Sequence, residues 1–215
     1  MIKGKDGIYN RGFKRLIDIF CAMLAILIFW WLYVILAILV RLKLGSPIMF
    51  KQARPGKIDP KTGKEKIFYL YKFRTMTDAR DKNGEFLPDE ERLTKFGKIL
   101  RSTSMDELPE VFNIIRGDMS IIGPRPLLVR YLPYYTDIER ERHTVRPGLT
   151  GLAQVNGRNY LMWDDRLKLD VKYARSLSFI GDIKILFMTV MKVLKRSDVA
   201  EKRIIPFDEY RKGKE

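Results

Sequence analysis

The sequence predicts a mainly helical α+β protein, in which an N-terminal membrane-inserted helix precedes a compact domain with a small β-hairpin. Residues 19–40 form 22 consecutive apolar residues. Two short segments rich in aromatic and β-branched residues, 48–52 and 67–73, are typical of paired strands. Two later segments repeat apolar residues at helical spacing. We therefore divide the 215 residues into a membrane part with its flanks (1–45), a compact domain (46–200) and a C-terminal tail (201–215).

The apolar segment is long enough to be inserted in a membrane. At about 1.5 Å of rise per residue it forms a helix of about 33 Å, against a hydrocarbon core of about 30 Å. It is longer than the apolar region of a signal peptide, and no small-x-small cleavage pattern follows it before Arg41. We expect this helix to be retained in the mature protein.

The topology of this helix stays open between two forms. Lys and Arg flank both of its ends, so the positive-inside rule gives no direction. Charge at both ends favours a re-entrant hairpin with both ends on the cytoplasmic face. However, no Gly or Pro lies between Gly12 and Gly45 to break the helix, and Trp30-Trp31 stands at its midpoint. We favour the re-entrant form because of the heavy N-terminal charge, with a straight span as the alternative.

The remaining elements follow from local patterns. Residues 53–66, with their turn residues and charge, predict a long loop in the hairpin. Residues 88–101 predict one helix, acidic at its start and basic at its end, and residues 105–115 a second helix ended by Gly117. Residues 164–175 and 180–195 also show helical periodicity. The last of these is basic and amphipathic, which fits either a membrane interface or ordinary core packing.

Charge and composition narrow the classes of partner. Lys and Arg number 41 against 26 Asp and Glu, a formal net charge of +15. Such a chain attracts phosphates, and the apolar segment favours lipid headgroups and a nucleotide or phospholipid substrate over nucleic acid. Cys21 is the only cysteine, which excludes an intrachain disulfide and a cysteine metal cluster. His143 is the only histidine, and we interpret it as structural or as a substrate contact.

An adjacent carboxylate pair is the first candidate for chemistry. In RSTSMDELPEVFN, Asp106 and Glu107 stand near a predicted helix start, where backbone N–H groups stabilise anions. An ionised carboxylate can serve as a nucleophile or as a ligand of Mg²⁺. The structural alternative is a capping box, which the spacing of Ser104 and Glu107 matches. Pro109 weakens that alternative, because it would lie too deep in a helix capped by Ser104.

Two further segments carry arginines in rigid or glycine-rich surroundings. In GDMSIIGPRPLL, prolines on both sides of Arg125 restrict the backbone and hold a planar guanidinium for phosphate. In HTVRPGLTGLAQVNGRN, Arg146 and Arg158 bracket glycines and amides that suit phosphate and polar ring recognition. Each segment alone fits an ordinary loop as well. Together they outline an anion-binding cleft beside the carboxylate pair.

Five segments, in order, resemble a known family: KRLIDI, YKFRTM, SMDELPEVFN, GDMSIIGPRPLL and RPGLTGLAQVNGRN. Over residues 14–195 they look like the successive blocks of the bacterial sugar transferases, the small monotopic phosphoglycosyl transferases, and are particularly similar to the bacillosamine-phosphate transferases of bacterial protein N-glycosylation. The resemblance implies transfer of a sugar 1-phosphate from a UDP-sugar to polyprenol (undecaprenyl) phosphate with release of UMP. It implies the first membrane step of glycoconjugate assembly, on the cytoplasmic face of the bacterial plasma membrane. Membrane lipids and downstream glycosyltransferases would be further partners.

The resemblance also implies roles for single residues. Asp106 would form a covalent phosphosugar-aspartyl intermediate, and Glu107 would help to position Mg²⁺, with both carboxylates as metal ligands. Four basic residues match basic positions of the family blocks and are candidates for binding phosphate and nucleotide: Lys72, Arg125, Arg146 and Arg158. In one respect the chain departs from the family, whose apolar helix carries a Ser-Pro break where Trp30-Trp31 stands here.

Two other functions are kept as alternatives. An ordinary membrane-associated glycosyltransferase would release UDP, but we find neither an Asp-x-Asp metal motif nor an extended nucleotide-binding α/β unit in the sequence. A membrane-tethered basic protein that binds acidic lipid or nucleic acid without catalysis would show salt-sensitive binding and no UMP formation.

Overall fold

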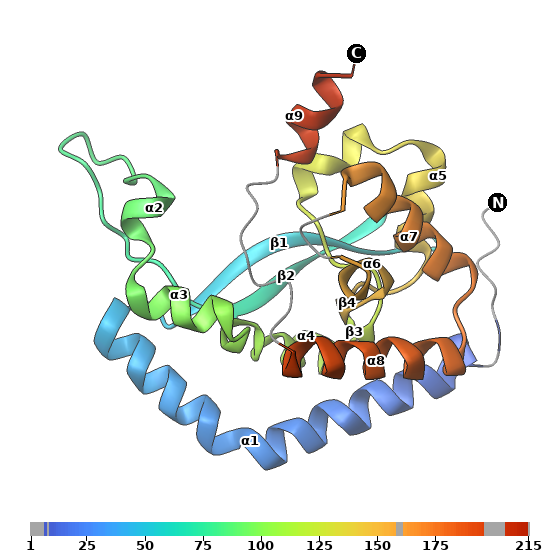
Figure 1. Cartoon of the computed structure of the whole chain (residues 1–215), viewed down its shortest axis with the longest axis horizontal. Helices are drawn as coiled ribbons and strands as arrows, with labels where there is room; N and C mark the ends of the chain where they lie inside the picture. Colours follow the sequence, from blue (N-terminus) through green and yellow to red (C-terminus); the bar gives the residue numbers. More distant parts are fainter. Residues whose placement is uncertain (1–6, 8, 158–160, 196–204, 215) are drawn as a thin grey trace.

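The computed structural model describes residues 7, 9–157, 161–195 and 205–214. The fold is mainly helical, with one two-stranded antiparallel hairpin and one short parallel pair of strands among the described residues. The long helix α1 (Lys14–Leu44) lies along one side, and the remaining elements are gathered on the other (Figure 1). This confirms the predicted fold class.

Helix α1 is continuous over 31 residues, with Trp30-Trp31 near its middle and no Gly or Pro inside it. It follows a short π-helical turn, Tyr9–Phe13, and ends at Gly45, whose positive φ of 83° suits glycine. It is the one helix of the described chain that is long and apolar enough to cross a membrane by length and composition. Figure 1 shows that it bends near its middle, so that both ends approach the rest of the protein.

Polar contacts attach the N-terminal end of α1. The Nζ atom of Lys14 lies 2.6 Å from the Oδ2 atom of Asp182, and both side chains are buried. Asp18 accepts a hydrogen bond of 3.0 Å from the backbone N–H of Ile121. Arg15 donates to the backbone carbonyl of Ile115 at 2.7 Å. The start of α1 is therefore fixed to segments that lie about a hundred residues and more further along the chain.

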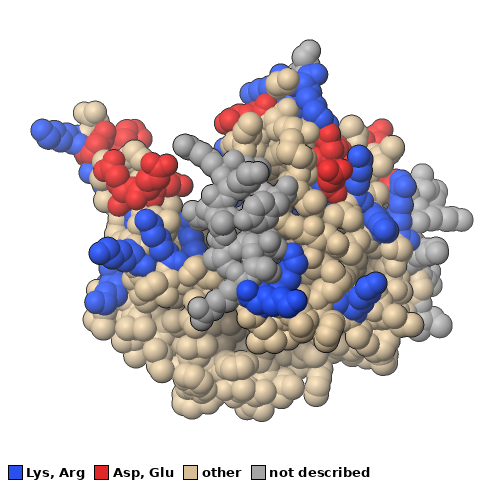
Figure 2. Space-filling model, in the orientation of Figure 1, with Lys and Arg blue, Asp and Glu red and all other residues tan. Residues whose placement is uncertain are grey.

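Apolar packing attaches the C-terminal end of α1. Leu36, Val40 and Leu44 are buried against Phe73 and Leu100. The middle of the helix instead exposes large apolar side chains, among them both tryptophans. On the face shown in Figure 2, the lower surface, where α1 lies, carries no charged side chain. Lys and Arg side chains lie directly above this surface. An apolar surface of this kind, bordered by positive charge, matches a bilayer and its anionic headgroups.

The hairpin is longer than the sequence indicates. Strands β1 (Met49–Ile58) and β2 (Glu65–Phe73) pair antiparallel from Met49 opposite Phe73 onward. The predicted loop over residues 53–66 is wrong in extent, because β1 continues beyond Pro55 through a shift of register before Ile58. Gly56 permits this, since a Cβ atom there would lie 2.9 Å from the carbonyl oxygen of Lys66.

The helix predicted over residues 88–101 is in fact two, α2 (Asp89–Arg92) and α3 (Lys95–Ser102). Leu93 is extended and forms a bridge with Met76. The Thr94 hydroxyl accepts from the N–H of Gly97 and starts α3 as its N-cap. A capping residue inside the predicted helix thus divides it.

The predicted second helix begins later than its periodicity indicates. A short 3-10 turn, η2 (Met105–Glu107), precedes α4 (Glu110–Arg116), which ends at Gly117 as expected, with φ of 91°. Ser104 makes no capping bond through its side chain and has a left-handed backbone, φ 55°. The capping-box interpretation is therefore wrong, because the carboxylate pair lies in the turn before the helix.

The rest of the domain is built from short elements around two longer helices. Helices α7 (Trp163–Arg175) and α8 (Phe179–Leu194) confirm the predicted helices there. Only Asp182 and Ile185 of α8 are buried, and most of its apolar side chains are exposed, which favours the membrane interface over core packing. The other elements are β3 (Ser120–Ile122), η3 (Val129–Tyr134), α5 (Asp137–Arg140), η4 (Glu141–Thr144), β4 (Gly148–Thr150) and α6 (Leu152–Val155).

The C-terminal segment, interpreted as a tail, contains a packed helix. Helix α9 (Phe207–Lys212) places Phe207 fully buried against the rings of Tyr131, Tyr135 and Trp163. The Nε1 atom of Trp163 donates to the carbonyl of Ile205 at 2.8 Å. One large buried aromatic residue is enough to anchor this polar helix of six residues. Because the rest of the helix is polar, its composition alone predicts a tail.

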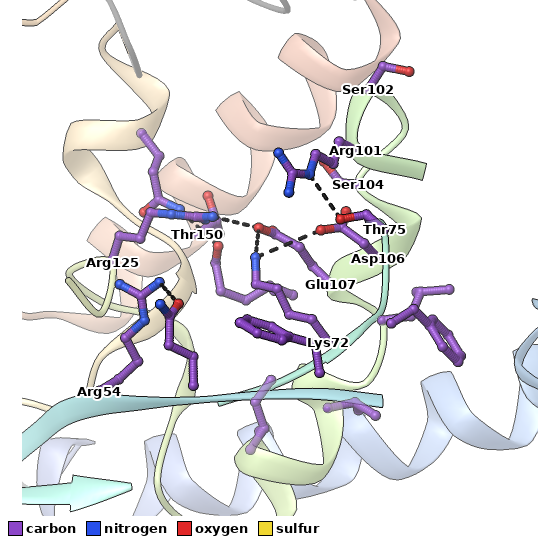
Figure 3. A pocket seen from close by; sticks show the side chains of 18 of the residues that line it. Arg54, Lys72, Thr75, Arg101, Ser102, Ser104, Asp106, Glu107, Arg125 and Thr150 are labelled. Carbon is purple, nitrogen blue, oxygen red and sulfur yellow. Dashed lines mark hydrogen bonds and ion pairs between the residues drawn. The ribbon is translucent and has the colours of Figure 1, made fainter. Parts of the chain in front are cut away.

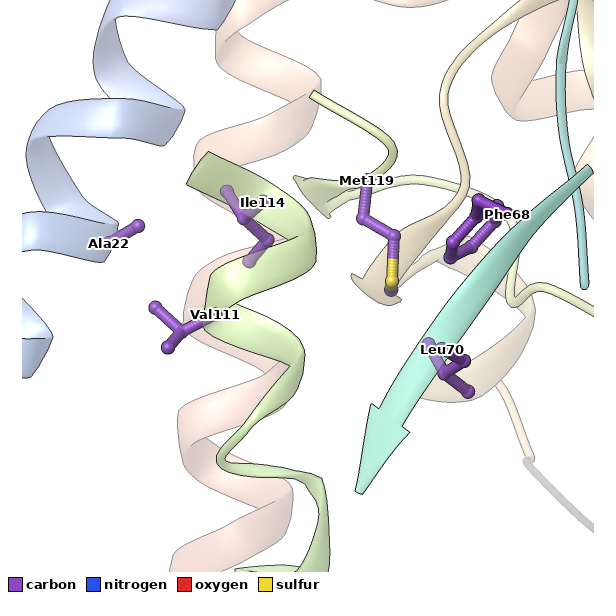
Figure 4. Packing of buried hydrophobic residues seen from close by; sticks show 6 residues of the cluster. All are labelled: Ala22, Phe68, Leu70, Val111, Ile114 and Met119. Atoms are coloured by element: carbon purple, nitrogen blue, oxygen red, sulfur yellow. The ribbon is translucent and has the colours of Figure 1, made fainter. Parts of the chain in front are cut away.

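A small apolar core holds α4 between the hairpin and α1. Val111 and Ile114 of α4 face Ala22 of α1, and on the other side Phe68 and Leu70 of β2 close the cluster (Figure 4). Because α4 follows the carboxylate pair in the chain, this packing fixes the position of Asp106 and Glu107 relative to α1.

Candidate active site

The candidate site is a cavity of about 1330 Å³ between α1, the hairpin, α4 and α8. Asp106 and Glu107 line it together with Lys72 and Arg125, so the fold brings these four predicted residues into one place. They come from η2, from β2 and from the loop after β3, and their side chains point toward one another (Figure 3). The site is therefore assembled by the tertiary structure from three separate segments.

Lys72 is at the centre of three carboxylates. Its Nζ atom lies 2.6 Å from Oε1 of Glu107, 3.3 Å from Oε1 of Glu110 and 4.0 Å from Oδ2 of Asp106. Glu110 is a buried residue of α4 that the sequence analysis missed, although its position three residues after Glu107 places both on neighbouring turns. One cation thus holds together negative charges that would otherwise repel.

The two carboxylates of the pair are engaged differently. Glu107 also receives Nη2 of Arg125 at 2.5 Å, and Arg125 and Lys72 hold its pKa well below the usual range although burial alone would raise it. Asp106, only 7% exposed, has its pKa raised by burial, and the charge of Lys72 opposes this. Burial and the charge of Glu107 raise the pKa of Glu110 to about 7. Glu107 is fixed in its position, whereas Asp106 has the less occupied carboxylate.

A second group of cations lines the cavity beside the carboxylates. Arg54 of β1 donates to the carbonyl of Pro126 at 3.2 Å and to Oε1 of Gln52 at 2.5 Å, while its buried Nε atom has no partner. Burial and the nearby Arg125 lower the pKa of Arg54 to about 10, which leaves it charged at neutral pH. Arg166 also lines the cavity and stacks on Trp163, 4.6 Å from its ring centre. A buried cation with an unused donor suits an anionic ligand.

The sequence analysis missed Arg54, yet a signal for it exists. Arg54-Pro55 repeats the Arg-Pro pairs at residues 125–126 and 146–147. Proline after arginine restricts the backbone in each case and gives the long side chain a fixed origin. The pattern therefore marks Arg54 as it marks Arg146, and less strongly than Arg125, which has a proline on both sides.

Of the other predicted basic residues, the one that the structure describes lies away from this cavity. Arg146 is half-buried, donates from Nε to the carbonyl of Gly117 at 3.0 Å and is not among the residues that line the cavity. Arg158 lies outside the described residues. His143 is buried between Arg142 and Glu65, and burial lowers its pKa to about 4, which agrees with a structural role.

The carboxylates suit a metal ion that is shared with a substrate. Within the described residues, no three His, Cys, Asp or Glu side chains are grouped to hold a metal by themselves. Mg²⁺ is commonly bound by one or two carboxylates, with phosphate oxygens and water as the other ligands. Asp106 and Glu107 are such a pair and line the same cavity, so these two residues would suit Mg²⁺.

Comparison with known proteins identifies the family. The family model described as bacterial sugar transferase matches residues 9–196. The chain is 50% identical over 181 residues to "Uncharacterized sugar transferase EpsL" of Bacillus subtilis, covering 84% of this chain and 87% of that protein. It is 38% identical over 193 residues to the UDP-glucose:undecaprenyl-phosphate glucose-1-phosphate transferase of Klebsiella pneumoniae, covering 85% of this chain and 40% of the relative.

A third relative extends the range of sugars. The UDP-N-acetylgalactosamine-undecaprenyl-phosphate N-acetylgalactosaminephosphotransferase of Aeromonas hydrophila is 38% identical over 193 residues, 84% of this chain and 43% of that protein. The chain thus spans most of the Bacillus protein and less than half of these two longer relatives. From the family model, which covers the hairpin, the carboxylate pair and α8, and from these identities, we conclude that the chain belongs to the bacterial sugar transferase family.

Proposed function

We propose that this chain is a phosphoglycosyl transferase, which moves a sugar 1-phosphate from a UDP-sugar to undecaprenyl phosphate and releases UMP. The observation that carries the proposal is the unequal carboxylate pair, with Glu107 held by Lys72 and Arg125 and Asp106 left for reaction. The names of the longer relatives, which specify this reaction with glucose or N-acetylgalactosamine, support it. The proposed place is the first membrane step of glycoconjugate assembly.

In the first half-reaction, an Oδ atom of Asp106 attacks the phosphorus that carries the sugar. The bond from that phosphorus to the bridging oxygen breaks, and UMP leaves with the electron pair. A phosphosugar-aspartyl intermediate remains, in which an acyl phosphate keeps a good leaving group. Asp106 suits the attack because its nearest cation, Lys72, is 4.0 Å away, whereas Glu107 is bound at 2.5 and 2.6 Å.

In the second half-reaction, a phosphate oxygen of undecaprenyl phosphate attacks the same phosphorus. The bond to Asp106 breaks, the carboxylate is restored, and an undecaprenyl-diphosphate sugar forms. Lys72, Arg125 and Arg54 offset the negative charge of the phosphates in both steps, because their donors line the cavity beside the pair. When bound by Asp106 and Glu107, Mg²⁺ would further neutralise the diphosphate.

The nucleotide product separates this reaction from ordinary glycosyl transfer. With undecaprenyl phosphate and a panel of UDP-sugars, we expect UMP to form in step with glycolipid, because the bond cleaved lies within the diphosphate. Removal of Mg²⁺ by a chelator should abolish the reaction, and added Mg²⁺ should restore it. Nucleotide release is measured by chromatography, which separates UMP from UDP. UDP as the only nucleotide product would favour the ordinary glycosyltransferase. Salt-sensitive binding of lipid or nucleic acid without any nucleotide product would favour the tethered binding protein.

The proposed location is the cytoplasmic face of the bacterial plasma membrane, with α1 re-entrant. What supports this is the attachment of both ends of α1 to the same domain, through Lys14 and Asp182 at one end and Val40 and Phe73 at the other. A straight span would separate its two ends by the thickness of the bilayer. A re-entrant helix needs a bend near its middle. Figure 1 shows such a bend in α1, although the chain has Trp30-Trp31 in place of the family's Ser-Pro break.

Cysteine labelling tests the topology. In a Cys21→Ser background we place single cysteines at Gly7 and Lys61, on either side of α1 in the sequence. A membrane-impermeant maleimide should label neither position in intact cells and both after the cells are opened, because both lie on the cytoplasmic face. If position 7 reacts in intact cells while position 61 stays protected, α1 spans the membrane. Gel-shift analysis of the labelled protein provides the measurement.

A further inference from the structure

Glu110 is a buried carboxylate to which the reaction described above gives no role. Its side chain is 2% exposed, and it is not among the residues that line the cavity, whereas Lys72 is. Among the described residues, its Oε1 atom has no hydrogen-bond partner and lies 3.3 Å from Nζ of Lys72 in an ion pair. Glu110 therefore lies behind Lys72 as seen from the cavity, and its direct route to the reaction is through that ammonium.

The contact of α4 with β2 fixes Glu110 opposite Lys72. Asn113, which is fully buried, lies one helical turn after Glu110 and bridges two backbone groups of the strand. Its Nδ2 atom donates to the carbonyl of Tyr69 at 2.7 Å, and its Oδ1 atom accepts from the N–H of Tyr71 at 3.0 Å. Residues three apart in a helix share a face. The face of α4 that binds β2 therefore also presents Glu110 to Lys72.

A charge at this buried position lowers the stability of the fold. Burial and the nearby charge of Glu107 raise the pKa of Glu110 to about 7, because the ionised form is poorly solvated and is repelled. Glutamine has nearly the same shape, can accept a hydrogen bond from Lys72 and brings no charge to bury. A contact with only a structural purpose would therefore be more stable with glutamine than with glutamate.

The distances around Lys72 show what the charge of Glu110 does. The ammonium lies 2.6 Å from Glu107 and 3.3 Å from Glu110, but 4.0 Å from Asp106. An ammonium has three donors on a flexible stem, so its position follows the surrounding negative charges. The two glutamates thus draw it away from Asp106. A closer ion pair with Lys72 would stabilise the Asp106 carboxylate and make it a weaker nucleophile.

We propose that Glu110 is a positioning residue, whose charge holds Lys72 away from Asp106 and keeps the Asp106 carboxylate available for attack. The proposal rests on the proposed function, in which Asp106 is the nucleophile. Without the charge of Glu110, the ammonium would share its donors between Glu107 and Asp106. The oxygen that attacks phosphorus would then be engaged by a cation. Glu110 thereby sets the reactivity of Asp106 through a single intervening side chain.

Glu110→Gln removes the charge and keeps the shape. In single-turnover experiments with UDP-sugar and no acceptor, we expect the rate of UMP formation to fall about tenfold, as when groups that orient functional side chains are replaced. The UDP-sugar concentration that gives half the maximal rate should stay the same or fall, because one negative charge near an anionic substrate is lost. The thermal midpoint at pH 8 should equal or exceed that of the wild type, since no charge is buried.

Two further variants serve as controls. Glu110→Asp keeps the charge, and the flexible side chain of Lys72 can follow a shorter carboxylate, so this variant should recover most of the rate. Glu141→Gln makes the same substitution in an ion pair with Arg175 at 2.6 Å, outside the cavity. It should change neither the rate nor the half-saturating concentration of UDP-sugar.

A double-mutant cycle tests whether Glu110 acts through Lys72. In the Lys72→Met background, Glu110→Gln should cause no further loss in the rate of UMP formation, because the ammonium that Glu110 positions is absent. Chromatography measures UMP, and intact mass spectrometry follows the phosphosugar adduct in the same samples.

A wild-type rate of UMP formation in Glu110→Gln would overturn the proposal. An equal loss of rate in the Lys72→Met background would also overturn it, and so would a loss of rate together with a lower thermal midpoint, which indicates a structural role. In each of these cases the wild type still forms UMP. Failure of the proposed function looks different, because the wild type would then release no UMP from any UDP-sugar.

Discussion

Asp106→Asn is expected to lower turnover by about four orders of magnitude or more, since an amide cannot form the acyl phosphate. The fold should persist, because asparagine has nearly the same shape and a neutral group costs less to bury. Burial raises the pKa of Asp106, which means that the folded protein already disfavours its charge. The thermal midpoint of the variant should therefore be equal to or slightly above that of the wild type.

Intact mass spectrometry supplies the direct measurement. Incubated with UDP-sugar and no acceptor, the wild type should gain the mass of one phosphosugar, and Asp106→Asn should gain none. The matched control is Asp165→Asn, which changes an exposed carboxylate paired with Lys168 at 3.6 Å, outside the cavity. An Asp106→Asn enzyme with wild-type turnover would remove the nucleophile assignment.

Lys72→Met should have the second-largest effect, on both activity and stability. The substitution leaves Glu107, Glu110 and Asp106 without their shared cation, and of these three carboxylates only Glu107 keeps a direct ion pair, with Arg125. We expect turnover to fall about a hundredfold or more, because the phosphates lose a preorganised positive group. The free energy of unfolding should fall by about 3 kcal/mol, since buried carboxylates lose their partner.

Lys66→Met is the matched control on the same strand. Its ammonium is paired with Asp118 at 3.5 Å, but the side chain is 72% exposed, so the change in stability should stay within about 0.5 kcal/mol. Lys72→Arg should recover part of the stability and less of the rate, because a planar guanidinium cannot take the position of a compact ammonium among three carboxylates. Chemical denaturation and steady-state kinetics of the four proteins give the comparison. Wild-type kinetics for Lys72→Met would contradict the assigned role of Lys72.

Much of the local structure could be predicted, because it depends on neighbours in sequence. Apolar runs and helical spacing indicate α1, α7 and α8, and Gly117 marks the end of α4. The errors occur where a single residue overrides a regional pattern. Thr94 divides one predicted helix into α2 and α3, and Phe207 docks a segment interpreted as a tail. A single capping residue or a single buried aromatic residue hardly alters the average pattern of a window of about ten residues, so its effect cannot be predicted from that pattern.

The sugar specificity remains a prediction. The longer relatives are named for different sugars, glucose and N-acetylgalactosamine, at the same 38% identity. The particular similarity to bacillosamine-phosphate transferases predicts a bacillosamine-type UDP-sugar as donor, and rates measured over a panel of UDP-sugars test this prediction. Physically, substituents on a sugar ring are distinguished by the shape of a pocket, which short motifs do not encode.

Sequence patterns are enough to identify the chemical groups of this protein: an apolar helix of membrane length, an adjacent carboxylate pair and arginines held by proline. Which of these groups meet depends on the folded structure. It places Lys72 beside Glu107 across 35 residues and Arg54 beside Pro126 across 72, and it leaves Arg146 at Gly117, outside the cavity. It also ties Lys14 to Asp182 across 168 residues, which brings both ends of α1 to one domain. Periodicity and spacing report contacts within a few residues of each other, whereas the distance between two charged groups far apart in the chain is set by the packing of every element between them.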